Sequence, residues 1–150
     1  MISGKLIHLI ETHEGEITNR IMAEIRSDPG LTHLRIITEA ELRRRGNSIV
    51  KNLGHWLVGK NQDEMAREYE NLGHKRAEED VPLHEAVRAL FFVKEKIFDF
   101  VAEQGFNLDA LTLYAEEELE RRVDRFFDVL VIHLVLGYES RWRRVAHAAA

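Results

Sequence analysis

The chain has 150 residues, 45% hydrophobic and 31% charged, with a net charge of −5 and no cysteine. The length predicts one domain over residues 1–150, and the lack of cysteine excludes disulfides, thiolate catalysis and cysteine-based metal sites. The acidic balance argues against a nucleic-acid-binding protein, which needs a clustered basic surface.

The N-terminal segment predicts one helix from Ser3 to about Arg26, because apolar residues recur three and four positions apart along one face. This segment lacks the apolar core and cleavage site of a signal peptide. No later apolar run approaches the roughly 20 residues that a membrane helix needs. We therefore expect a cytoplasmic protein with no membrane partner.

The middle of the chain predicts two more helices after an apolar connector. The connector is expected to pack over the core through four residues: Leu31, Leu34, Ile36 and Ile37. Thr38 and Glu41 form a capping-box pattern for a second helix that ends at about Val58. A third helix, from Gln62 to about Glu79, has a thin apolar stripe, so we expect it to be the most peripheral one.

A helix junction is predicted at Asp80-Val81-Pro82, because proline is favoured in a first helical turn and disfavoured inside a helix. The fourth helix then runs from Pro82 to about Glu103. Its wide apolar surface is expected at the centre of the core and consists of Leu83, Val87, Leu90, Phe91, Ile97, Phe98 and Val101.

The junction also carries a resemblance to a known family. After the Leu72-Gly73 pair, the pattern R-A-E-x-x-V-P-L-x-E-x-x-R-A-L begins at Arg76. Between Leu72 and Phe100 the chain resembles the RsbRD N-terminal family, helical sensory domains at the front of bacterial stress-response regulators and histidine kinases. The resemblance implies a sensory input domain and a signalling protein partner or downstream output domain.

The fifth helix is predicted from about Leu108 to Val145, with Gly137 as its one candidate break. It is roughly 57 Å long at 1.5 Å per residue, whereas a compact domain of this size is about 40 Å across. One end must therefore project or pack against a second chain, and we expect a homodimer, which Leu134→Glu would break. The expected dimer seam consists of Val123, Phe126, Leu130, Leu134, Tyr138 and Trp142.

The eight histidines do not have the spacing of a metal site, because the sequence contains no His-x-x-x-His or Glu-x-x-His pair. There is also no phosphate loop, nucleophile elbow or paired-carboxylate spacing. We therefore expect no catalytic residues, no metal and no cofactor, and a protein that is not an enzyme.

An alternative hypothesis gives His84 and His133 a cofactor-binding role, because imidazole ligates haem iron and titrates near neutral pH. The protein would then be a small-molecule or haem-binding sensor with a cavity between the fourth and fifth helices. Six aromatic residues are candidates to line it: Phe91, Phe92, Phe98, Phe100, Phe126 and Phe127.

Taken together, the sequence predicts an all-α five-helix bundle with an over-long C-terminal helix that dimerises. The favoured function is a non-catalytic signalling input domain that passes a signal through this helix to a partner or output module. The sequence does not identify the signal.

Overall fold

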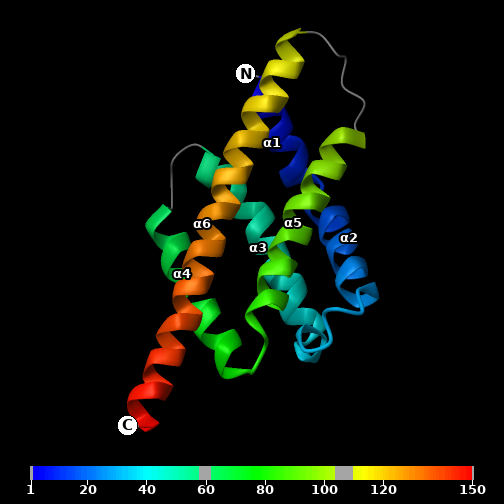
Figure 1. The fold of residues 1–150 in the computed structure, drawn as a ribbon. Coiled ribbons are helices and arrows are strands. Elements are labelled where there is room, and N and C mark those ends of the chain that lie inside the picture. Colours follow the sequence, from blue (N-terminus) through cyan, green and yellow to red (C-terminus); the bar gives the residue numbers. More distant parts are fainter. Residues whose placement is uncertain (1, 58–61, 104–109, 150) are drawn as a thin grey trace.

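The computed structural model describes residues 2–57, 62–103 and 110–149. These residues form α-helices and one 3-10 turn, without a strand, so the predicted all-α fold is confirmed (Figure 1). None of the described helices is long and apolar enough to cross a membrane. The predicted boundaries at Val58 and Leu108 lie outside the described residues. In chain order the elements are α1 Ile2–Thr12, α2 Glu14–Ser27, η1 Leu34–Ile36, α3 Glu39–Leu57, α4 Gln62–Glu78, α5 Leu83–Glu103 and α6 Ala110–Ala149.

The predicted first helix is two helices, because the backbone bends at His13, where φ is −111° and ψ is 24°. The Thr12 hydroxyl donates to the carbonyl of Leu9 at 3.1 Å, and His13 Nδ1 lies 2.9 Å from the same oxygen. Side chains that bond nearby carbonyls compete with the helical backbone pattern. The apolar spacing continues across the bend, so periodicity alone predicted one helix.

The connector before α3 packs as expected, with one exception. Leu31, Leu34 and Ile37 are buried, whereas Ile36 is 77% exposed. Thr38 caps α3 by accepting a hydrogen bond from the amide of Glu41 at 3.2 Å. The other half of the predicted capping box is wrong, because the Glu41 carboxylate is engaged by α4 instead.

The helix junction lies where the sequence predicted it. Asp80 has a positive φ of 58°, and the amides of Asp80 and Val81 bond the carbonyls of Ala77 and Arg76 at 3.1 and 3.0 Å. This pattern is a Schellman ending of α4, with Asp80 in the left-handed position. The buried Tyr138 hydroxyl of α6 donates to the Val81 carbonyl at 2.8 Å, which ties the junction to α6.

Helix α4 packs along α6 more extensively than any other two described helices pack together, and it has no comparable contact with another described helix, which agrees with the predicted peripheral position (Figure 1). The helices meet at Gly73 and Gly137. A Cβ on Gly73 would lie 2.1 Å from the carbonyl oxygen of Leu134, and one on Gly137 would lie 2.1 Å from that of Glu70. Only glycine allows two backbones to approach this closely, so a thin apolar stripe is sufficient for close packing of α4 on α6.

Helix α5 supplies much of the core, as predicted, and packs against α6, α2 and α1 (Figure 1). Leu90, Ile97 and Val101 are buried, and Phe98 is partly buried against the core. Phe91 departs from the expectation because its side chain is 48% exposed.

Helix α6 has 40 residues, about 60 Å at 1.5 Å per residue, and its C-terminal turns extend beyond the other helices (Figure 1). The apolar stripe assigned to a dimer seam fills the core of a single chain instead. The other helices cover five of its members so completely that each is at most 1% exposed: Val123, Phe126, Leu130, Leu134 and Tyr138. We therefore reassign these five residues to the core. Trp142, at the uncovered end, is 51% exposed.

Candidate functional site

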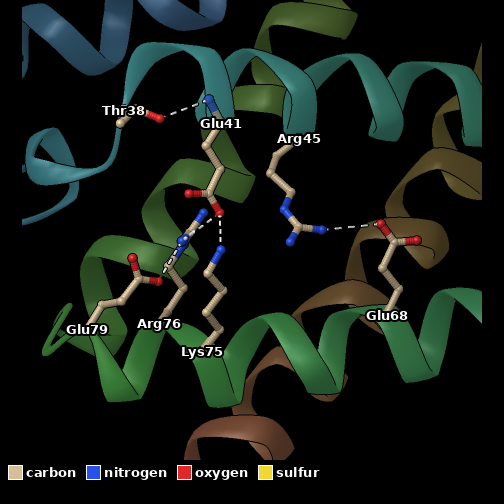
Figure 2. A network of polar contacts seen from close by, with 7 residues as sticks. All are labelled: Thr38, Glu41, Arg45, Glu68, Lys75, Arg76 and Glu79. Carbon is tan, nitrogen blue, oxygen red and sulfur yellow. Dashed lines mark hydrogen bonds and ion pairs between the residues drawn. The ribbon is translucent and has the colours of Figure 1, made fainter.

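A network of charged side chains joins α3 to the C-terminal half of α4 (Figure 2). The Glu41 carboxylate lies 2.6 Å from Lys75 Nζ and 3.3 Å from Arg76 Nη1, and Arg76 also lies 2.8 Å from Glu79 Oε1. Arg76 is only 3% exposed. A guanidinium buried to this extent needs compensating charge, and the two carboxylates provide it.

The network lowers the pKa of Glu41. The hydrogen bond from Lys75 is the largest cause, and the charge of nearby Arg76 adds to it, whereas partial burial of the carboxyl acts in the opposite direction. Opposite charges and hydrogen bonds to the ionised form both favour a carboxylate. Glu41 is therefore an anion at neutral pH and fixes the distance between α3 and α4.

Arg45 lies one turn after Glu41 on α3 and makes a weaker pair, with its Nη1 3.5 Å from Glu68 Oε1 of α4 (Figure 2). Its Nε is buried and has no hydrogen-bond partner among the described residues. Buried donors are almost always paired, because losing water without replacement costs free energy. Arg45 therefore presents an unused donor inside the protein.

Arg45 and Arg76 both border a partly open pocket of about 60 Å³. Tyr69 also borders it, and burial raises the pKa of this phenol, which therefore stays protonated. The rest of the lining is mainly apolar and comes from the helices α2 to α6 and from η1: Ile21, Ile25, Leu34, Leu42, Gly46, Ile49, Leu72, Ala86, Ala89, Leu90, Val93 and Leu134. An apolar cavity with a few polar groups at its edge is the usual form of a small-ligand site.

The histidines of the alternative hypothesis lie in different surroundings. His84 borders an open groove on α5 with Val87 and Phe91, whereas the Nδ1 of His133 on α6 lies 3.0 Å from Glu70 Oε1 on α4. The described lining of the pocket at Arg45 and Arg76 includes neither histidine and none of the six phenylalanines, whereas a second open pocket, between α5 and α6, includes Phe98 but neither histidine. The pocket at Arg45 and Arg76 is also smaller than the engineered cavity of about 150 Å³ that holds benzene, so it does not enclose a haem. No metal-binding cluster of three acidic, histidine or cysteine side chains occurs in the described part of the chain.

The outer face of α6 carries a second apolar pattern, distinct from the core stripe. Ile132, Val135, Trp142, Ala146 and Ala149 follow the alternating three- and four-residue spacing of heptad positions a and d, with a glutamate at 139. Ile132 is 57% exposed and Trp142 is 51% exposed. Two further exposed large apolar residues of the helix, Leu136 and Val145, occupy the flanking e and g positions. We call this surface the outer seam.

Sequence reasoning missed three features. The first is the close contact of α4 and α6 at Gly73 and Gly137, which we call the glycine crossing. The others are the positions of Arg45 and Arg76 at the edge of the pocket, and the outer seam. A glycine inside a helix lowers helix stability, so Gly73 and Gly137 were a signal of close packing that the sequence offered. The arginines gave no signal, because Arg45 belongs to a run of three arginines that resembles a solvated surface. The outer seam was hidden by the stronger core stripe on the same helix.

Residues 15–150 match the family described as "RsbT co-antagonist protein rsbRD N-terminal domain". This match covers most of the chain and includes the Leu72–Phe100 region that carries the resemblance in the sequence. No significant match to a curated protein or to a solved structure was found.

Proposed function

The chain belongs to the RsbRD N-terminal domain family, a family of regulatory input domains, and on that basis we propose that it is a non-catalytic input domain which dimerises and transmits a signal through α6. The observation that carries this proposal is the projection of α6 beyond the bundle (Figure 1). A helix that lies in the core between Leu119 and Tyr138 and ends outside it connects internal packing to whatever binds its free end.

The glycine crossing is the proposed point of transmission. Gly73 and Gly137 bring the backbones of α4 and α6 together without side chains between them, so a displacement of α4 has no flexible layer to absorb it. The pair formed by Glu70 and His133 flanks the crossing. Packed helices change by small shifts between discrete arrangements, and a shift here moves the projecting end of α6.

The outer seam is the proposed dimer contact, and a second copy of the chain is its occupant. Two such seams pack as a parallel coiled coil, in which a and d residues of one helix face those of the other. A two-fold axis then places both C-terminal ends on the same side. Glu139 occupies an a position, where it faces its own copy and lowers the stability of the coil.

The dimer is tested by analytical ultracentrifugation of the wild type and of Ile132→Glu. We expect a wild-type mass of twice the 17.5 kDa chain and a single-chain mass for the variant, because the new carboxylates oppose each other in the seam. Arg144→Glu is the matched control, since this exposed residue lies off the seam, and it should remain dimeric. A wild-type monomer would contradict dimerisation, whereas a dimeric Ile132→Glu would contradict the seam.

Transmission is tested by spin labelling, for which the absence of cysteine is an advantage. A single label at Arg144→Cys gives one label-to-label distance per dimer. We expect this distance distribution to shift when Gly137→Ala is added, because the new methyl forces α4 and α6 apart. An unchanged distribution in a folded, dimeric Gly137→Ala protein would refute transmission through the crossing.

A further inference from the structure

A polar groove lies between α4 and α6, which run side by side (Figure 1). It begins at the glycine crossing, because Gly137 is part of its lining, and it continues toward the C-terminal end of α6. Its α4 wall includes Glu70, Asn71 and His74, and its α6 wall includes Ser140, Arg143 and Arg144. The groove is open to solvent, so the chemical groups of its walls, and not its volume, decide what binds there.

The acidic group in this lining already has a partner. The Glu70 carboxylate lies 3.0 Å from the Nδ1 of His133, which precedes Arg143 by ten residues, or roughly 15 Å along the helix. Likewise, His74 Nε2 lies 2.8 Å from the carboxylate of Glu78 on the same helix. Neither Glu70 nor His74 therefore needs a ligand, and the carboxylate of Glu70 is held away from the arginines.

The arginines of the groove differ in this respect. Arg143 and Arg144 make no salt bridge with any residue that the structure describes, and both are exposed. Arg143 Nε donates to the carbonyl of Glu139 at 3.4 Å, which leaves its two Nη groups for a ligand. Guanidinium groups bind oxyanions through parallel, charge-assisted hydrogen bonds. The groove is thus suited to an anion.

Charge and donor number favour phosphate over a carboxylate. Two guanidinium groups without a carboxylate partner carry two positive charges, and a phosphate monoester carries about −1.5 to −2 at pH 7, whereas a carboxylate carries one negative charge. The oxygens of a phosphate also accept enough hydrogen bonds for both guanidinium groups and for the Ser140 hydroxyl and the Asn71 amide. The net charge of −5 argues against a polymer of phosphates such as nucleic acid.

We propose that this groove binds a phosphate group, free or as the monoester of a small soluble molecule, through Arg143 and Arg144. The binding stands without the proposed function. Its effect on signalling rests on that function: a phosphate that contacts Asn71 on α4 and the arginines on α6 joins the two helices beside the glycine crossing, and so favours one arrangement of the projecting end.

The test is a titration of the full chain with inorganic phosphate at low ionic strength, followed by ¹⁵N–¹H NMR. We expect saturable shifts in the Nε–H signals of Arg143 and Arg144, with an affinity of about millimolar that weakens as salt is added. Acetate is the probe with one charge and should bind severalfold more weakly. Absence of saturation with phosphate, or equal binding of acetate, would overturn the proposal.

Glycerol 3-phosphate separates the two sources of the phosphate group. Tighter binding of this monoester than of inorganic phosphate assigns the groove to a phosphorylated small molecule. Equal binding of the two assigns it to free phosphate. Either result supports the proposal, since the arginines contact the phosphate oxygens in both.

Two variants assign the contact. Arg144→Met removes one guanidinium group from the groove, and we expect phosphate affinity to fall by about tenfold, the effect of one charge-assisted hydrogen bond. Arg141→Met is the matched control, because it removes the same charge from the same end of α6 but Arg141 does not line the groove. Its affinity should stay within about twofold of wild type. Equal losses in both variants would mean that phosphate responds only to the overall charge of the helix end, which refutes the site. Ultracentrifugation of the same proteins reports dimerisation separately, so a failure of phosphate binding is distinguishable from a failure of the proposed dimer.

Discussion

The two parts of α6 differ in what covers them. Between Leu119 and Tyr138 the helix lies inside the bundle, and its inner apolar residues are at most 4% exposed. From residue 139 to 149 most side chains of the same helix are exposed to solvent, and Trp142 and Val145 are about half exposed. The spacing of apolar residues is similar in both parts. An apolar stripe thus indicates that a face is to be covered, but other elements of the fold decide whether the same chain or a second one covers it.

The largest effect that this comparison predicts is for Leu134→Glu. Leu134 is 1% exposed, and its replacement puts a carboxylate into the core, which should cost about 4 kcal/mol or more. We expect loss of the cooperative thermal transition followed by circular dichroism. The sequence-based expectation for this variant, a folded monomer, therefore changes to an unfolded chain.

Ile36→Glu is the matched control, because this aliphatic side chain lies outside the outer seam and is 77% exposed. It should lower the melting temperature by only a few degrees, since surface substitutions usually change stability by about 0.5 kcal/mol or less. If both variants melt alike, Leu134 does not lie in the core as described.

The next largest effect concerns the glycine crossing. A methyl group at Gly137 meets the carbonyl of Glu70 at 2.1 Å and the amide of His74 at 2.8 Å, and neither is a flexible side chain. We expect Gly137→Ala to reduce the free energy of unfolding by about 1–3 kcal/mol, the usual cost of overpacking. Urea denaturation measures it.

Gly15→Ala serves as the control for this substitution. Nothing lies within 4 Å of a Cβ at Gly15 in α2, and alanine favours helix more than glycine does, so stability should stay equal or rise. A neutral or stabilising Gly137→Ala would show that the α4 and α6 backbones are further apart than the structure places them.

The sequence predicted those features that depend on local patterns. Thr38 was recognised as a cap and Asp80-Val81-Pro82 as a junction because their signals lie within a few residues. The bend at His13 was missed because two side chains compete for one carbonyl without disturbing the apolar spacing. The position of Arg45 depends on residues from five helices that meet only in the folded chain, so no local pattern contains it.

A smaller effect is expected where the junction is tied to α6. Tyr138→Phe removes the hydroxyl that donates to the Val81 carbonyl at 2.8 Å but keeps the ring in the core. The loss of one hydrogen bond should cost about 1 kcal/mol. Urea denaturation should detect it. An unchanged midpoint for Tyr138→Phe would mean that this bond contributes nothing to holding α6 against the junction.

The smallest effect is the pH dependence of the α3–α4 network. Lys75 is the main cause of the lowered pKa of Glu41, whose ordinary value is 4.5. A carboxyl with a lowered pKa in the folded state adds stability above its unfolded pKa, and that stability is lost as pH falls through the folded value. Because Lys75 is 45% exposed, solvent screening limits the contribution to a few tenths of a kcal/mol, up to about 1 kcal/mol.

We therefore expect Lys75→Met to be less stable than the wild type at pH 7, and the difference to shrink as pH decreases below about 4.5. Denaturation curves from pH 7 to about pH 3 measure this difference. Lys51→Met is the control, because Lys51 is exposed on α3 and has no part in the network. A wild-type advantage that stays constant down to the lowest pH would mean that Lys75 stabilises the fold through packing of its alkyl chain, and that its charge does not hold α3 to α4.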